Sequence, residues 1–379
     1  MRLRIFQRVT TFAVCVASLA SASACQVPVF RYALERWPAD RYELAVFHRG
    51  GLSPEQNSAL AAVDPLANIE VVTVDVSKMG VAEQAIYGPV QVAEGGALMR
   101  LYYPRESGIE VPVWKANLTR ETVVKLVDSP ARREISERVL AGQSAVWVIV
   151  GGAGDAEEEA ALEERVRDQL TTISKSLEIP EGVVGPGSLD RVASGEVAME
   201  DVLRSTIPLK IEFDVMRVDR NDPAEALFVA MLFGVSVDAL EEFPEAPLLF
   251  PVFGRGRTID GLPAPMVSEE LLQGACSYLC GACSCEVKKD NPGIDLVMRA
   301  DWNAAIEGSE VVIEKTLPPL AGAGDLVADA PVLASSSPTP LLRPKKMARN
   351  MLWQAGLVAA IFVVLVIIVT LALRKEDRE

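Results

Sequence analysis

Four cysteines lie within ten residues of one another, and this cluster carries the clearest chemistry in the sequence. They are Cys276, Cys280, Cys283 and Cys285, in the run CSYLCGACSC. Thiolate sulfur is a ligand for soft metal ions, and four converging thiolates suit tetrahedral zinc, or Cu(I) at a lower coordination number. The cluster therefore predicts a soft-metal site for zinc or copper.

The spacing of these cysteines predicts how they would converge. Cys276 and Cys280 are four residues apart, so a helix would place both thiols on one face with Cβ atoms about 5 to 6 Å apart. A disulfide needs about 3.5 to 4.5 Å, which excludes a bridge between them within an intact helix. Gly281 is expected to end that helix in a left-handed turn, which would let Cys283 and Cys285 curl back over the same face.

Two other interpretations of the cluster stay open. Outside the cytoplasm cysteines usually oxidise, and pairs such as Cys276 with Cys283 could form structural disulfides if the helix ended early. A redox-active dithiol is the third interpretation. The CxxxCxxC spacing also matches the iron-sulfur ligands of radical SAM enzymes, but nothing else in the chain resembles their barrel, and an exported site would meet oxygen.

The N-terminus predicts export. Arg2, Arg4 and Arg8 precede an apolar stretch, and the small residues 22–24 then form a cleavage site, so residues 1–24 are predicted to be a signal peptide. Cleavage would leave Cys25 first, and lipidation of Cys25 is an alternative, although Ala22 stands where a lipobox has leucine. A first transmembrane helix is disfavoured because the apolar stretch is too short to span a bilayer.

A membrane anchor is predicted at the other end of the chain. Residues 351–373 carry no charge and would form a helix about 34 Å long, enough to cross a bilayer. Residues 317–350 read as a flexible linker. Basic residues flanking the anchor slightly favour the body inside. An exported chain, however, reaches its anchor already committed, so we expect the body outside the cytoplasm and a cytoplasmic tail over residues 374–379.

Charge and composition exclude several classes of function. The net charge is −15, which would repel nucleic acid, so no nucleic-acid partner is expected. His48 is the single histidine, which removes a serine-histidine-aspartate triad and multi-histidine zinc sites. A glycine run at residues 151–154 opens a predicted helix, but the acidic residues that follow it would repel phosphate.

The body between the two ends contains two similar successions of elements. The first is predicted to have strands at residues 42–48 and 69–76, a hairpin at 97–103 and 110–114, and helices that begin near residues 53, 117 and 129. The second is predicted to have a strand at 145–150, a helix capped by Asp155, a strand at 211–218, a helix starting in a capping box at Asp222 to Glu225, a hairpin at 248–253 and 257–262, and a helix capped by Ser268.

Both successions resemble the thioredoxin-like fold. The run APLLFPVFG, from Ala246 to Gly254, resembles the loop and central hairpin of that family, with Pro247 at its cis-proline. The resemblance implies an α/β fold class, with two sandwich domains at residues 25–142 and 143–316. The family's reactive CxxC would follow the first strand of each half, but residues 48–51 and 151–155 contain no cysteine. The usual redox chemistry is therefore expected to be absent.

Three hypotheses for function follow. The first is a non-catalytic binding or interaction module of the cell envelope, whose cysteines are disulfide-bonded or hold a soft metal. The second is a thiol-disulfide oxidoreductase that uses the C-terminal cysteines. The third is a scaffold for membrane-complex partners. The chain as a whole also resembles bacterial envelope proteins with a cysteine cluster and a C-terminal anchor, a resemblance that implies no activity.

Overall fold

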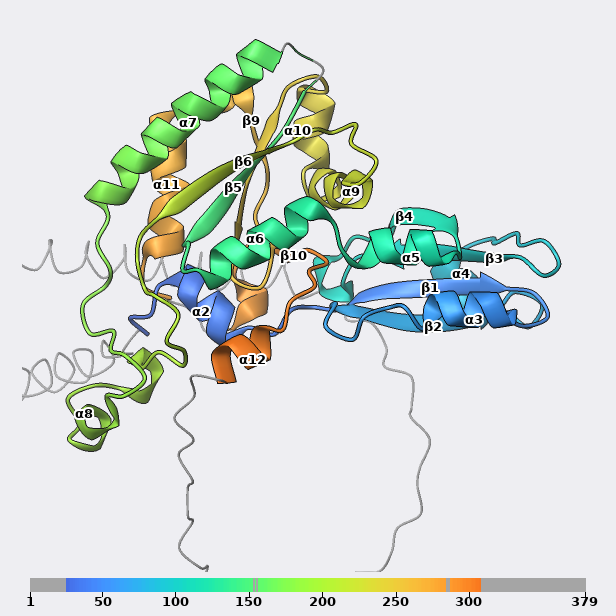
Figure 1. The fold of residues 1–379 in the computed structure, drawn as a ribbon, viewed down its shortest axis with the longest axis horizontal. Coiled ribbons are helices and arrows are strands. Elements are labelled where there is room, and N and C mark those ends of the chain that lie inside the picture. The colour runs from blue at the N-terminus through green and yellow to red at the C-terminus, as the bar shows by residue number, and fades with distance from the viewer. Residues whose placement is uncertain (1–24, 153, 155, 284–286, 308–379) are drawn as a thin grey trace, which may run out of the picture. The chain divides into compact units, whose positions relative to one another are not determined.

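The computed structural model describes residues 25–152, 154, 156–283 and 287–307. The predicted signal peptide, linker, anchor and tail lie outside these residues, as do Asp155 and Cys285. No helix in the described part of the chain is long and apolar enough to cross a membrane. The described residues form a mixed α/β structure with two sheets (Figure 1).

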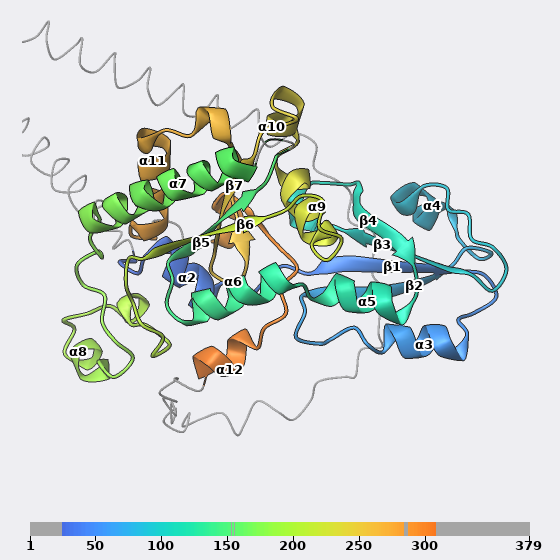
Figure 2. The ribbon, with the colours of Figure 1, turned by 45° about the horizontal axis from the view of Figure 1, so that its top comes forward.

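The first sheet has the order β2-β1-β3-β4, with β1 and β2 parallel and the next two pairs antiparallel. Its strands are β1 (Tyr42–His48), β2 (Ile69–Asp75), β3 (Ala97–Tyr102) and β4 (Pro112–Asn117). The sequence predicted each of them, with ends that differ by a few residues. Both faces are covered, because helices lie on the two sides of the sheet (Figure 2).

Local capping explains where two of the helices of this half begin. The helices are α3 (Pro54–Leu60), α4 (Val81–Tyr87), α5 (Arg120–Val127), α6 (Pro130–Leu140) and the 3₁₀ turn η1 (Arg105–Ser107). Ser53 and Gln56 form a capping box on α3, and the Thr119 side chain accepts from the backbone N–H of Thr122 at the start of α5. Each cap satisfies a backbone donor that the first helical turn leaves unpaired.

The second sheet repeats the pairing of the first. Its order is β10-β8-β7-β5-β6, with β5 parallel to β6 and antiparallel to β7, and β9 also pairs with β7. The strands are β5 (Ala145–Val150), β6 (Phe213–Val218), β7 (Leu248–Phe253), β8 (Arg257–Thr258), β9 (Leu262–Pro263) and β10 (Ile294–Asp295). Every residue of β5 and β7 is buried, as their continuous apolar runs indicate.

Helices cover this sheet on both sides (Figure 1). They are α7 (Ala156–Ser176), α8 (Leu189–Ala193), α9 (Ala226–Val235), α10 (Val237–Glu242), α11 (Glu269–Cys280), α12 (Trp302–Glu307), and the 3₁₀ turns η2 (Met199–Asp201), η3 (Ala264–Met266) and η4 (Lys288–Asp290). The buried stripe of α7 includes Leu162, Val166 and Leu170, at the helical spacing that the sequence predicted.

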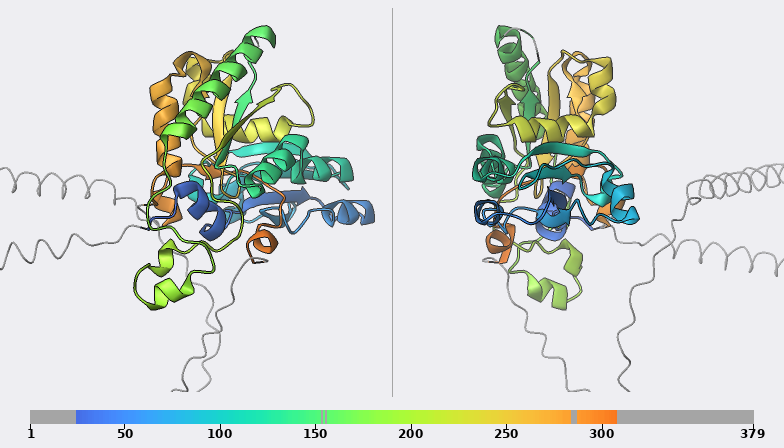
Figure 3. Two further views of the ribbon diagram at one scale, coloured as in Figure 1. Left: turned by 60° about the vertical axis from the view of Figure 1, so that its left-hand side comes forward. Right: turned by 90° about the vertical axis from the view of Figure 1, so that its right-hand side faces the viewer.

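The N-terminal helix α2 (Val29–Arg36) packs into the core of the second sheet although it precedes the first sheet in the chain. Phe30 shares a buried cluster with Phe253 of β7 and Leu279 of α11. Figure 3 shows α2 beside the end of α11. A separate buried cluster draws residues from both sheets, so the two sheets share part of one core.

Two local predictions outside the cysteine cluster are wrong. The helix expected from a capping box at Asp222 begins only at Ala226, and its N-cap residue Glu225 makes no capping bond. Glu225 instead accepts from Ser129 Oγ at 2.6 Å and from the backbone N–H of Ala131 at 2.8 Å, so its carboxylate caps α6. The expected cis bond before Pro247 is also absent, because no peptide bond among the described residues is cis.

Candidate functional site

Helix α11 carries the first two cysteines of the predicted site. Ser268 caps this helix by accepting from the backbone N–H of Leu271 at 3.3 Å, as predicted. Cys276 and Cys280 are both buried on it, but they lie in different clusters. Cys276 packs with the cluster around Trp147, whereas Cys280 packs with the cluster around α2. The helix therefore holds the two thiols in separate apolar surroundings.

The chain leaves α11 in a direction that the sequence did not predict. Gly281 is extended, with φ −68° and ψ 160°, so the expected left-handed turn is wrong. The segment after it pairs antiparallel with the N-terminal segment: Val29 N–H donates to Gly281 O and Cys283 N–H to Val27 O, each at 3.0 Å. Because of this pairing, Cys283 lies beside the N-terminal segment and does not curl back over α11.

Cys25 is the third cysteine of the α2 cluster, which the sequence analysis did not place there. It is 4 % exposed, and its Sγ donates to Glu200 O at 3.2 Å. Cys25, Cys280 and Cys283 share one buried cluster. The odd number of cysteines after the predicted signal peptide did not point to this burial, because it fits a Cys25 that is lipidated or free.

Burial decides the chemistry of the α11 thiols. It raises the pKa of Cys280 to about 12, and it raises the pKa of Cys276 further, with a smaller contribution from nearby Cys280. Both groups therefore stay protonated at neutral pH. No disulfide joins two of the described cysteines, and the described residues contain no group of three histidine, cysteine or acidic side chains placed to hold a metal ion. The four-cysteine metal site stays a prediction, because Cys285 lies outside these residues.

Because the Cys280 thiol is buried, we expect the free energy of unfolding to fall as the pH rises. Above about pH 9 the unfolded chain releases the Cys280 proton, while the folded chain keeps it up to about pH 12. The contribution is thus complete below pH 9 and is lost as the pH rises. We expect the free energy of unfolding to fall by about 1.4 kcal/mol per pH unit more steeply in the native chain than in Cys280→Ala. Urea midpoints from pulse proteolysis between pH 9 and pH 11 measure both slopes, and parallel slopes would contradict the prediction.

In both loops where a thioredoxin-like protein would carry its CxxC, side chains form hydrogen bonds with the backbone. In the first, His48 Nδ1 accepts from the backbone N–H of Gly51 at 3.2 Å. In the second, Glu159 Oε1 accepts from Gly152 N–H at 2.7 Å, and Arg220 donates to Gly151 O at 2.5 Å. The Glu159 carboxylate thus places a negative charge against a backbone N–H of the second loop.

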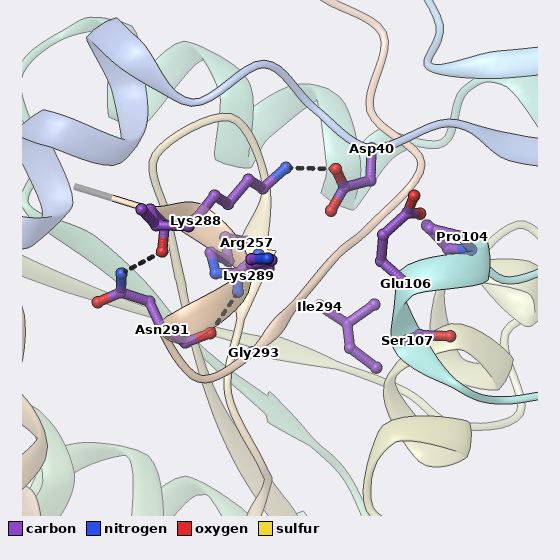
Figure 4. Close-up of a pocket in the computed structure, with 11 residues that line it drawn as sticks. Asp40, Pro104, Glu106, Ser107, Arg257, Lys288, Lys289, Asn291, Gly293 and Ile294 are labelled. Carbon is purple, nitrogen blue, oxygen red and sulfur yellow. Dashed lines mark hydrogen bonds and ion pairs between the residues drawn. The ribbon is translucent and has the colours of Figure 1, made fainter. Parts of the chain in front are cut away.

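A polar pocket of about 320 Å³ lies beside the segment that follows the cysteines (Figure 4). No sequence signal pointed to it, because its walls come from four separate parts of the chain. The described lining residues are Asp40, Pro104, Glu106, Ser107, Arg257, Val287, Lys288, Lys289, Asn291, Gly293 and Ile294. Neither cysteine nor histidine is among them, so this lining offers no thiol or imidazole chemistry.

The inner charges of this pocket are paired with one another. Arg257 forms a buried ion pair of 3.1 Å with Asp295 and lies over the ring of Trp37. Lys288 bonds to Asp295 and lies 2.9 Å from Asp40. Burial, and then the charge of Asp295, raise the pKa of Asp40, and Lys288 opposes this shift. These ion pairs therefore hold the inner charged side chains of the pocket in place.

Two exposed, charged side chains at the rim of the pocket are available to contact a ligand. Lys289 and Glu106 are exposed and carry opposite charges on two different walls. An exposed pair of this kind can orient a bound molecule through its two opposite charges. The arrangement suits binding of a polar ligand.

No protein-family model matches this chain, and the curated proteins contain no match to it.

Proposed function

We propose that this protein is a non-catalytic binding or interaction module of the cell envelope, exported by residues 1–24 and anchored by residues 351–373. The observation that carries the proposal is the burial of the cysteine thiols. Cys276 and Cys280 lie in apolar clusters with pKa values far above neutrality, so neither is a nucleophile in this conformation. The pocket lined by Lys288, Lys289 and Glu106 offers charged groups that can bind a ligand.

The proposal includes a thioredoxin-like fold for both halves. Its support is the repeated topology: β2-β1-β3-β4 and β6-β5-β7-β8 each combine a parallel pair with an antiparallel hairpin. This is the strand, helix, strand, hairpin order that the resemblance implied. The trans bond before Pro247 departs from the family pattern.

We further propose that the Cys25 thiol is part of the folded body and carries no lipid. A diacylglycerol on Sγ would have to pass through the cluster that buries Cys25 and break its bond to Glu200 O. The C-terminal helix is then the anchor that holds the protein to the membrane.

The alternative function is a thiol-disulfide oxidoreductase. It is favoured by one observation, the gathering of Cys25, Cys280 and Cys283 in one cluster. It requires that the cluster open, because a buried thiol reaches neither a partner disulfide nor the thiolate form.

Thiol reactivity of the full chain in detergent distinguishes the two functions. In the native protein, we expect maleimide to label Cys276 and Cys280 at least about 100-fold more slowly than in the urea-unfolded protein, with each site read by mass spectrometry. A Thr172→Cys variant supplies the control, because residue 172 is exposed on α7 and its thiol should react at the unfolded rate.

Metal analysis and a disulfide-reduction assay on the same preparation complete the test. Bound zinc or copper that is lost in Cys280→Ser would assign the soft-metal form of the binding module. Fast native labelling together with catalytic disulfide reduction that Cys280→Ser abolishes would contradict the proposal in favour of the oxidoreductase.

A further inference from the structure

The polar pocket of about 320 Å³ carries one acid and one base that have no partner in the described part of the chain. Lys289 and Glu106 are both exposed, and neither makes a hydrogen bond or ion pair with another described residue. Figure 4 shows Glu106 on the wall that also carries Pro104 and Ser107, away from the wall that carries Lys289. A ligand in the pocket therefore meets a negative charge on one side and a positive charge on the other.

Each of the two charges stands on a short turn beside a buried or paired neighbour. Glu106 lies in η1, two residues after the buried Pro104. Lys289 lies in η4, next to Lys288, whose ammonium group is 2.9 Å from Asp40. Both turns are thus formed before a ligand arrives, so binding does not have to order them.

The net charge of the pocket favours a ligand that carries both signs. The inner arginine and lysine are paired with two aspartates, so the inner charges cancel. A simple anion in the pocket would lie close to Glu106, and a simple cation would lie close to Lys289. Like charges brought together on binding are unfavourable, whereas a zwitterion can contact both residues with the opposite charge.

The same pocket has an apolar surface that a ligand would cover. Pro104, Val287 and Ile294 belong to its lining, and Val287 is 47 % exposed. Removing such a surface from water is favourable. The volume is at the lower end of the range for ligand pockets, about 300 to 1,000 Å³, so the ligand should be small.

We propose that this pocket binds a small zwitterion with an apolar side group, of the size of an amino acid or a dipeptide. Its ammonium group contacts Glu106, its carboxylate contacts Lys289, and its side group lies against Val287 and Ile294. The inference rests on the proposed binding function and names the class of ligand.

Isothermal titration calorimetry of the full chain in a non-ionic detergent tests the ligand class. Leucine and alanyl-leucine should bind, and the tighter of the two tells a free amino acid from a peptide. Leucinamide lacks the carboxylate and N-acetyl-leucine lacks the ammonium group, so each should bind at least about tenfold more weakly than leucine. Equal binding of leucine and either blocked form would overturn the proposal in favour of a site for a simple cation or a simple anion.

Charge reversal tests the two residues. Glu106→Lys and Lys289→Glu should each weaken binding of leucine at least about tenfold. Combining them should restore binding, because a small zwitterion can turn round in the pocket. Glu178→Lys and Lys175→Glu are the matched controls, since both residues are exposed and lie outside the lining, and they should change nothing. Binding that survives both single changes in the pocket would overturn the proposal.

The proposed function can fail separately from this inference. Suppose that neither zwitterion binds at about 10 mM while Cys276 and Cys280 still react slowly with maleimide. The zwitterion site is then wrong and the non-catalytic binding module stands. Fast native labelling with catalytic disulfide reduction contradicts the proposed function, whatever the calorimetry shows.

Discussion

Glu35→Gln should lower the free energy of unfolding by about 3 to 5 kcal/mol, the usual effect of removing one partner from a buried ion pair. The Glu35 carboxylate is fully buried, 2.9 Å from the guanidinium of Arg31. It also accepts from the backbone N–H groups of Arg204 and Ser205, at 2.8 and 3.0 Å. Glutamine keeps the shape but leaves the Arg31 charge buried without a counter-charge.

Losing this counter-charge is costly, because the buried guanidinium of Arg31 cannot turn outward to be solvated. Its guanidinium is 1 % exposed and donates to Ser205 Oγ and to Ile207 O. Burial lowers the pKa of Arg31, and Glu35 opposes that shift, so the substitution removes the main group that stabilises the charged form. Pulse proteolysis of the full chain in urea measures the change.

The control for this substitution is Glu196→Gln. Glu196 forms an ion pair with Arg191 in which both side chains are about half exposed, so its loss should cost less than about 1 kcal/mol. Equal effects of the two substitutions would mean that the Arg31 and Glu35 pair contributes no more than a surface pair.

Arg132→Met should be as destabilising, about 3 to 5 kcal/mol, for a different reason. Arg132 is 1 % exposed, and its guanidinium donates to Lys125 O, Leu126 O and Val297 O. Methionine fills much of the space but leaves these carbonyl groups without their donor. Burial lowers the pKa of Arg132 to about 10, which still leaves it charged at neutral pH.

The neighbouring Arg133→Met is the control, because Arg133 is exposed and bonds only to Asp128 among the described residues. It should cost less than about 1 kcal/mol. Hydrogen exchange gives a second readout: Arg132→Met should speed exchange near Val297, where the guanidinium joins two distant parts of the chain. Unchanged exchange there, with stability equal to that of Arg133→Met, would refute the role assigned to Arg132.

Predictions from a local pattern agree with the structure where the groups that interact are also close together in the sequence. The Ser53 capping box, the Ser268 cap and the buried strand at Ala145–Val150 are examples. The capping box at Asp222 did not form, because the Glu225 carboxylate accepts hydrogen bonds from Ser129 and Ala131 and so caps α6 instead. Gly281 is extended because pairing with the N-terminal segment competes with a left-handed turn.

The candidate site likewise contains residues that the sequence predicted and contacts that it did not. The sequence singled out Cys276, Cys280, Cys283 and Cys285 as candidate metal ligands, since thiols four residues apart on a helix are a local pattern. The sequence did not indicate that Cys276 and Cys280 pack into different clusters, because those clusters are built from different strands and helices. The polar pocket stayed unseen for the same reason, since Asp40 and Lys288 are far apart in the chain and meet only in the fold.

By itself, the sequence determined the main strands of both sheets, the starts of α3 and α11 and the repeat of two α/β halves, because side-chain periodicity and capping act over a few residues. Only the tertiary structure decided that α2 completes the second core, that Arg31 bonds to Ser205, 174 residues away, and that the α11 thiols are shielded. The physical reason is that burial and ion pairing depend on which distant surfaces meet, and no single stretch of sequence contains both of them.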